Sequence, residues 1–178
     1  MGEKILVAYA SLLGSTSAVA EYVGQTLREM GDVVDVRHID DVPDLSPYYA
    51  VVLGGAIRFQ KPLPELENFV KTHLDALKKK PVACFVLSLT MRVDTEENRL
   101  QVFGWLAPLV NLLQPVDLGL FAGALRYGRL SPFLRIYLRM TGKPQGDFRD
   151  WNVIRKWTLE LREKFAAVVN DTAIKQRN

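Results

Sequence analysis

The sequence predicts an α/β domain built on a doubly wound parallel sheet. Short apolar segments alternate along the chain with amphipathic helical segments, which is the pattern of successive β-α-β units. The apolar segments lack a regular alternation of polar and apolar residues, so helices are expected on both faces of the sheet. The chain has 178 residues, of which 48% are hydrophobic and 24% charged. This length and composition favour a single domain over residues 1–178 with its own core.

Five strands are expected, and each is short, rich in aliphatic residues and bounded by turn-forming residues. They cover residues 4–10, 33–39, 50–54, 81–88 and 116–122. Ligands of such sheets bind beyond the carboxyl ends of the strands. The segments that follow the strands, at 11–17, 55–62, 89–95 and beyond 122, are therefore the places where a site is expected.

Four helices are expected between and after these strands. The first ends at Gly31, and its stripe comprises Ala18, Tyr22, Thr26 and Met30 beside Val19, Val23 and Leu27. The second covers about 63–79, and the third begins near Thr95 with glutamates in its first turn. Pro108 is expected to kink or split the third helix. The last helix covers about 151–169 and carries the stripe Trp151, Ile154, Thr158, Leu161 and Phe165.

Several classes of site are disfavoured by the composition. Cys84 is the only cysteine, so neither a disulfide framework nor a multi-cysteine metal site is possible, and a buried inert thiol is expected. His38 and His73 lack the spacing of metal ligands, and no metal site is expected. No signal peptide is recognisable at the first residues, and no apolar run reaches the roughly 18 residues that span a bilayer. A cytoplasmic protein is therefore expected.

The basic residues are concentrated in one segment. The net charge is +3, yet five basic residues and no acidic residue occur between Arg126 and Lys143. Four of them, Arg126, Arg129, Arg135 and Arg139, accompany an apolar run, and they are expected to meet an anionic substrate or the surface of a membrane. A third interpretation is a lid that packs on its own domain with incidental arginines. The connection 123–150 is much longer than the usual 2–6 residues, so a functional reason is expected for it.

The first loop, Ser11-Leu12-Leu13-Gly14-Ser15-Thr16, combines three hydroxyl groups with the start of a helix. Backbone N–H groups, the helix dipole and hydroxyl donors together favour a phosphate group. The loop has no lysine and does not match GxxxxGK[ST], and the GxGxxG fingerprint is also absent, so nucleotide hydrolysis and dinucleotide binding are disfavoured. The alternative is that Ser15 or Thr16 merely caps the helix.

The loop 11–16 resembles the FMN phosphate loop of flavodoxins. Two further stretches, Gly55-Ala-Ile-Arg-Phe59 and Phe121-Ala-Gly-Ala-Leu-Arg-Tyr127, resemble the menaquinone-dependent protoporphyrinogen oxidase family. Leu138-Arg-Met-Thr-Gly142 and Asp150-Trp151 are similar to the same family. That family is a flavodoxin with a long insertion after strand five, here about 123–149. The resemblance implies a flavodoxin-like fold with five parallel strands in the order 2-1-3-4-5.

The resemblance also implies the roles of particular residues toward FMN. The phosphate would be held by Ser11, Leu12, Gly14, Ser15 and Thr16. One wall of the ring site would comprise Ala56, Ile57, Arg58 and Phe59, and the other Ser88, Leu89, Thr90 and Arg92. Phe59 is the expected stacking residue, although the family has tyrosine there. Leu12 and Leu13 stand where the family has polar residues.

The function expected from the resemblance is that of an FMN-dependent oxidoreductase, with protoporphyrinogen IX or a related reduced substrate as donor and a quinone as acceptor. The flavin would carry the redox chemistry, so no protein catalytic residue is expected. The first alternative is an electron-transfer flavodoxin that shuttles between protein partners. The second is a module that has lost FMN and serves in protein interactions. Nucleic acid is not an expected partner. Peripheral contact with the inner face of the cell membrane is expected through residues 126–143.

Overall fold

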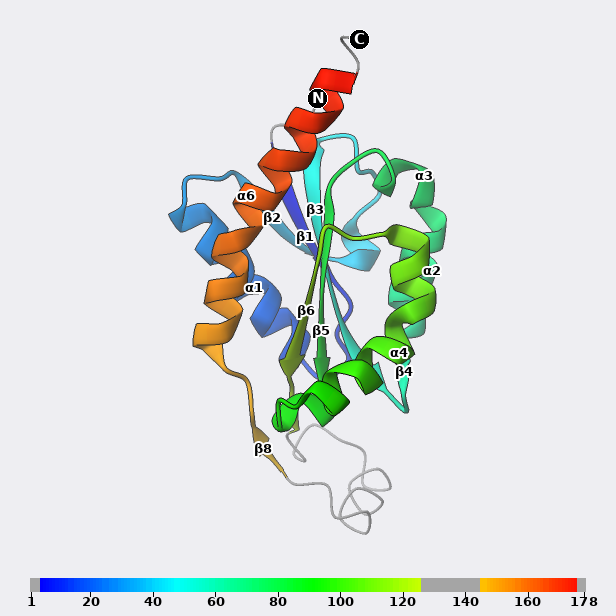
Figure 1. The fold of residues 1–178 in the computed structure, drawn as a ribbon, viewed down its shortest axis with the longest axis vertical. Helices are drawn as coiled ribbons and strands as arrows, with labels where there is room; N and C mark the ends of the chain where they lie inside the picture. The colour runs from blue at the N-terminus through cyan, green and yellow to red at the C-terminus, as the bar shows by residue number, and fades with distance from the viewer. Residues whose placement is uncertain (1–3, 126–144, 176–178) are drawn as a thin grey trace.

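A central parallel sheet of five strands organises the protein (Figure 1). The computed structural model describes residues 4–125 and 145–175, with side chains as far as residue 169. Across the sheet the strands follow in the order β2 (Val34–His38), β1 (Lys4–Tyr9), β3 (Tyr48–Arg58), β5 (Val82–Ser88) and β6 (Asp117–Ala122). All neighbours in this path are parallel. The predicted order 2-1-3-4-5 is confirmed, because the extra strand β4 (Lys61–Pro62) pairs only with β3 at its end.

The strands are apolar on both faces because helices cover both faces. In β1, Ile5 and Val7 lie in the core on one side of the sheet, whereas Leu6 and Ala8 lie in the core on the other. All four side chains are fully buried. Burial on both faces explains why the strand segments read as continuous apolar runs.

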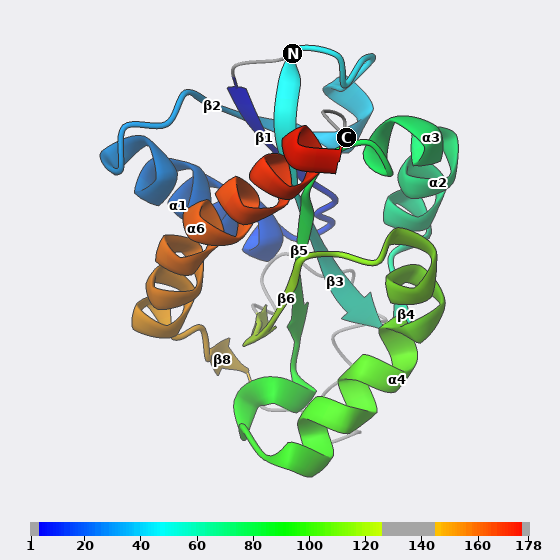
Figure 2. The ribbon, with the colours of Figure 1, turned by 45° about the horizontal axis from the view of Figure 1, so that its top comes forward.

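Two helices, α1 (Ser15–Glu29) and α6 (Trp151–Lys175), pack side by side on one face of the sheet (Figure 2). The predicted stripe of the last helix is confirmed, since Ile154, Thr158, Leu161 and Phe165 are buried and Trp151 is partly buried against the same core. The predicted stripe of α1 is partly wrong. Val19, Val23 and Leu27 form the buried face, whereas Ala18 is exposed. A four-residue repeat drifts around a helix of 3.6 residues per turn, so position 18 falls outside the stripe that contacts the sheet.

The opposite face is covered by α2 (Pro64–Thr72), α3 (Leu74–Leu77) and α4 (Glu96–Leu113). The expected single helix over 63–79 is two helices, because His73 leaves helical geometry with φ −104° and ψ 14°. In contrast, α4 is one helix that continues through Pro108, so the expected split is absent, although the helix bends along its length (Figure 2). A proline leaves the carbonyl group four residues earlier without its helical partner. That residue is the exposed Gly104, so water can satisfy the carbonyl.

Short elements complete the part of the chain that the structure describes. Two 3₁₀ turns, η1 (Ile39–Asp41) and η2 (Thr90–Arg92), follow β2 and β5. A two-stranded antiparallel ladder joins β7 (Ala124–Leu125) to β8 (Gly146–Asp147). The predicted basic residues Arg126, Arg129, Arg135 and Arg139 lie outside the described residues.

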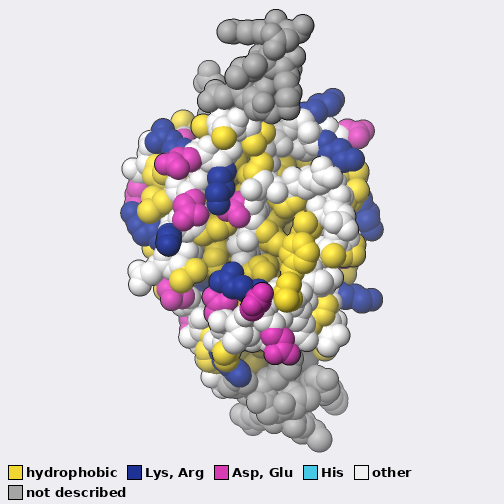
Figure 3. All heavy atoms as spheres, viewed as in Figure 1, with side chains coloured by type: hydrophobic (Ala, Val, Ile, Leu, Met, Phe, Trp, Pro, Cys, Tyr) yellow, Lys and Arg dark blue, Asp and Glu magenta, His cyan; other side chains and the backbone are white. Residues whose placement is uncertain are grey.

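The surface between α6 and α4 is apolar in the view of Figure 3, where hydrophobic side chains gather in a band over the edge strand β6. Among the described residues, no helix has the length and hydropathy needed to cross a lipid bilayer.

Candidate functional site

A pocket of about 240 Å³ lies at the carboxyl ends of the central strands. Its lining comes from four segments that are far apart in the sequence. They contribute Ser11, Leu12, Leu13, Ser15 and Thr16, then Ala56, Ile57, Arg58, Phe59 and Leu63, then Leu87, Ser88 and Leu89, and finally Gly123, Ala124 and Leu125. The pocket therefore occupies the place where ligands of doubly wound sheets bind.

Ten of the thirteen residues that the sequence suggested for cofactor binding line this pocket. Three do not, namely Gly14, Thr90 and Arg92. Gly14 lies beside the pocket as the cap of α1 and has φ +81°, a conformation that glycine adopts without strain. The lining is polar near the start of α1 and largely apolar elsewhere.

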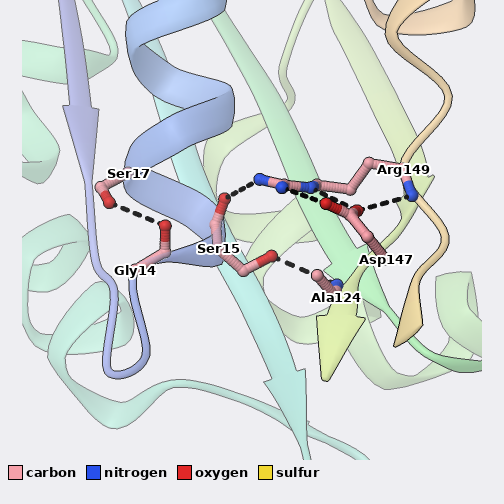
Figure 4. Close-up of polar contacts among 6 residues, drawn as sticks. All are labelled: Gly14, Ser15, Ser17, Ala124, Asp147 and Arg149. Carbon is pink, nitrogen blue, oxygen red and sulfur yellow. Dashed lines mark hydrogen bonds and ion pairs between the residues drawn. The ribbon is translucent and has the colours of Figure 1, made fainter. Parts of the chain in front are cut away.

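The first loop is held by its own hydroxyl groups. The Gly14 N–H donates to Ser11 Oγ at 3.1 Å. Ser17 Oγ donates to the Gly14 carbonyl oxygen at 2.9 Å (Figure 4). Neither Ser15 nor Thr16 caps the helix, because the cap residue is Gly14 and no side-chain cap bond forms. The capping alternative for this loop is therefore wrong.

The N-terminus of α1 differs from those of the other long helices in the described chain. α4 is capped by Thr95 Oγ1, which accepts from the Asn98 N–H at 3.2 Å. α6 is capped by Asp150, whose Oδ1 accepts from Asn152 N–H and Val153 N–H, and α2 has two glutamates in its first turn. α1 has neither a side-chain cap nor an acidic residue there. No carboxylate of its own first turn therefore offsets the positive end of the α1 dipole, an arrangement that favours an anion there.

One wall of the pocket is formed by the end of β3. This strand turns back into β4 through a two-residue loop, Phe59-Gln60, since Arg58 pairs with Lys61. Both loop residues have positive φ, 50° and 63°. The Phe59 side chain is 68% exposed at the rim, and the Arg58 guanidinium lies over its ring at 5.2 Å. The hairpin therefore presents an aromatic ring and a cation to a ligand that enters the pocket.

The opposite wall follows β5. Ser88 and Leu89 line the pocket, and Ser88 Oγ accepts from the Thr90 N–H at 3.2 Å. Arg92 is directed elsewhere, with its guanidinium 5.5 Å from the centre of the Phe148 ring. In the described structure, Arg92 thus supports the segment before α6.

Six lining residues were missed by the sequence reasoning. They are the leucines Leu13, Leu63, Leu87 and Leu125 together with Gly123 and Ala124. Gly123, Ala124 and Leu125 belong to a stretch that already carried the family resemblance, and that was the available signal. Leu63 and Leu87 gave none, because an apolar wall residue looks like a core residue in a sequence.

A network beside the first loop was also missed. Ala124 N–H donates to Ser15 Oγ at 3.2 Å, and Arg149 Nη1 donates to the Ser15 carbonyl oxygen at 3.4 Å (Figure 4). The Arg149 guanidinium also forms a two-point ion pair with Asp147. These contacts connect β7 and the segment after β8 to the first residue of α1.

The pocket offers binding groups and no evident nucleophile. Cys84 lies within β5 and is 4% exposed, and burial raises the pKa of its thiol to about 12. No group of three or more His, Cys, Asp or Glu residues that could hold a metal ion occurs in the described ranges. The arrangement suits a ligand that brings its own chemistry.

Comparison with known proteins gives both relatives and fold neighbours. Protoporphyrinogen IX dehydrogenase [quinone] from Escherichia coli K12 is 27% identical over 172 residues, which cover 89% of this chain and 94% of the relative. The Leishmania major protein of that name is 27% identical, with 89% and 74% covered.

Among solved structures, the Streptococcus pneumoniae TIGR4 flavodoxin has a TM-score of 0.55 at 15% identity, with 90% of this chain and 98% of that chain covered. A Fusobacterium nucleatum flavodoxin bound to flavin mononucleotide has a TM-score of 0.53 at 13% identity, covering 91% and 98%. At these identities the two neighbours show the fold. The flavodoxin domain family itself matches residues 6–152. The sheet order, the site at the strand ends and this match together show that the chain belongs to the flavodoxin domain family.

Proposed function

We propose that this protein is an oxidoreductase that holds FMN, without a covalent bond, in the pocket beyond β1, β3 and β5. Membership of the flavodoxin domain family supports FMN as the cofactor. The observation that carries the proposal is the polarity of the pocket, with the uncapped start of α1 at one end and apolar walls at the other. FMN has the same division, because a charged phosphate and a flat ring lie at its two ends.

The residues of the pocket fit this cofactor. The first N–H groups of α1 and the hydroxyls of Ser11 and Ser15 would hold the phosphate. Phe59 would stack on the ring, and Ile57 and Leu125 would keep water from it. Ser88 and Leu89 would line the opposite side.

FMN supplies the redox chemistry when bound, so the chain contributes position and charge. Arg58 places a cation at the wall formed by β3, where it would stabilise added negative charge on the cofactor. Thr90 and Arg92 would act indirectly, since Thr90 fixes Ser88 and Arg92 contacts Phe148. No protein acid or base is assigned.

The proposed donor is protoporphyrinogen IX or a related reduced porphyrin, and the proposed acceptor is a quinone. The support is the printed activity of the curated relatives at 27% identity. In each two-electron oxidation the donor loses two electrons and two protons, and the quinone gains them to become a quinol. Contact with an anionic membrane through 126–143 is proposed from the basic sequence alone.

The test begins with the absorbance spectrum of the purified protein and identification of the released flavin. The FMN-loaded protein is then mixed with protoporphyrinogen IX and a soluble quinone without air, and porphyrin fluorescence is followed. Turnover is expected with quinone and none without it, with the flavin-free protein as control. A yellow protein that exchanges electrons only with redox proteins would instead be an electron carrier. A colourless protein that does not take up FMN would contradict both assignments.

A further inference from the structure

Ser15 is the residue at which three segments of the chain meet. Its hydroxyl oxygen accepts from the Ala124 N–H of β7, and its carbonyl oxygen accepts from Arg149 (Figure 4). Ala124 in turn pairs with Asp147 in the β7–β8 ladder. Asp147 forms the two-point ion pair with Arg149. The contacts form a closed ring of four residues.

Arg149 is unusually fixed for a charged side chain. Only 7% of it is exposed, and its guanidinium lies 4.6 Å from the centre of the Trp151 ring. Trp151 contacts Tyr22 of α1 edge-on, with ring centres 4.9 Å apart. Three contacts restrict the guanidinium: the ion pair, the aromatic stack and the bond to Ser15. A planar guanidinium with several donors is suited to make such contacts at the same time.

The closed ring of four residues leaves the Ser15 hydroxyl able to donate a hydrogen bond to an anion. A hydroxyl that accepts through its oxygen still has its own hydrogen to donate, and the Ala124 N–H restricts the direction in which that hydrogen points. A cation beside a helix N-terminus is unfavourable to the helix dipole. Asp147 balances the charge of Arg149, so the pair adds no net charge at the start of α1.

We propose that Arg149 is a positioning residue for the phosphate of FMN and that it acts through Ser15. Arg149 holds Asp147, the β7–β8 ladder holds Ala124, and Ala124 orients the Ser15 hydroxyl toward the phosphate site. The inference rests on the proposed FMN function and deepens it. It concerns the phosphate end alone, so affinity for riboflavin, which lacks the phosphate, should not depend on Arg149.

The test compares FMN and riboflavin affinities by quenching of flavin fluorescence. The double variant Asp147→Asn, Arg149→Met removes the ion pair without leaving an unpaired carboxylate beside the loop. It should weaken FMN binding roughly five- to tenfold and change riboflavin binding less than about twofold. The matched control is Glu29→Gln, Arg155→Met, which removes an ion pair of 2.8 Å between α1 and α6 at the far end of α1. The control should change neither affinity.

A second comparison asks whether Arg149 acts through Ser15. In a Ser15→Ala background, the Asp147→Asn, Arg149→Met change should cost FMN binding little more, because the hydroxyl that it positions is gone. An undiminished loss in that background, or equal losses for FMN and riboflavin, would overturn the inference.

Two further outcomes separate the inference from the function on which it rests. If the double variant does not fold, Arg149→Lys keeps the charge but lacks the planar fork that pairs with Asp147 at two points while it bonds to Ser15. A smaller loss specific to FMN is then expected, and an unchanged ratio of FMN to riboflavin affinity contradicts the inference. A wild-type protein that binds both flavins equally contradicts the phosphate site and the inference together. A wild-type preference for FMN that survives every Arg149 variant contradicts the inference alone.

Discussion

Arg58 and Phe59 stand at the rim of the pocket, where solvent and a bound ring would meet. The guanidinium covers one face of the Phe59 ring at 5.2 Å. The aromatic contact already restricts the Arg58 side chain. Arg58 therefore loses less conformational entropy on pairing with a ligand than a free surface arginine would. The charge of Arg58 should therefore act on the cofactor from a defined position.

The first residue-scale prediction is that Arg58→Gln lowers the midpoint potential of bound FMN. Loss of the cation disfavours the reduced form, which carries more negative charge. A shift of roughly 20–60 mV is expected, since a tenfold change in relative affinity corresponds to about 59 mV for one electron. Lys71→Gln on the exposed side of α2 is the control with the same charge change, and redox titration is the measurement. Equal shifts in both variants would mean that net charge, and not position, sets the potential.

At this scale the sequence predicts the polar part of the pocket better than its apolar part. Ser11 and Ser15 were recognisable because hydroxyl groups at the turn between a strand and a helix suit either a phosphate or a helix cap. The resemblance assigned Arg92 to a wall of the pocket, whereas its guanidinium contacts Phe148, a residue far along the chain that a local motif does not reveal. Arg149 gave no signal either, since its importance depends on burial and on the ring with Ser15.

At the scale of elements, the β3–β4 hairpin is built against local preference. Two-residue loops with positive φ at both positions favour Asn-Gly, and this loop is Phe59-Gln60. Non-glycine residues in this conformation cost roughly 1 kcal/mol each. Strain of this kind is often found at binding sites, and here it holds Phe59 outward at the pocket rim.

The second prediction follows from this strain. Gln60→Gly should raise the free energy of unfolding of the flavin-free protein by about 1 kcal/mol, because glycine adopts positive φ freely. Gln25→Gly, in the middle of α1 on an exposed position, should lower it by about 1 kcal/mol. Urea denaturation followed by circular dichroism gives both values. A loss of stability in Gln60→Gly would show that its side chain stabilises the loop by more than the strain costs.

The apolar pattern of the sequence predicts where the buried strands lie but not where every strand or helix ends. Buried strands are predictable because two covered faces demand apolar residues at every position, as in β1 and β5. The extension of β3 to Arg58 was missed, since residues beyond 54 have no regular pattern and no turn dipeptide. The break between α2 and α3 at His73 was missed because no glycine or proline marks it in the sequence.

For the whole molecule, Cys84 offers a measure of global stability. It is the only cysteine, it lies in a central strand of the sheet, and burial raises its thiol pKa to about 12. At neutral pH the native thiol is therefore protonated and shielded, so an alkylating reagent reaches it after the sheet opens.

The third prediction is that FMN slows the labelling of Cys84. A ligand that binds the folded state reduces the open fraction by the factor 1 + [L]/Kd, which is about a hundredfold at a concentration of 100 Kd. Riboflavin at the same multiple of its own Kd should protect equally, and mass spectrometry of the alkylated chain measures the rate. Labelling that does not depend on either flavin would indicate local opening around β5 instead of global unfolding.

The β7–β8 ladder also has a consequence for how this chain can change in evolution or by engineering. Leu125 and Gly146 are paired across it, so the two ends of the segment between them are neighbours. The entropic cost of closing a loop grows slowly with length, by about 0.6 kcal/mol for each doubling. Segments of quite different length can therefore be exchanged between these two residues at little cost in stability, provided the ladder forms. The ladder is thus a natural junction for replacement, where new specificity can be acquired while the parallel sheet keeps its register.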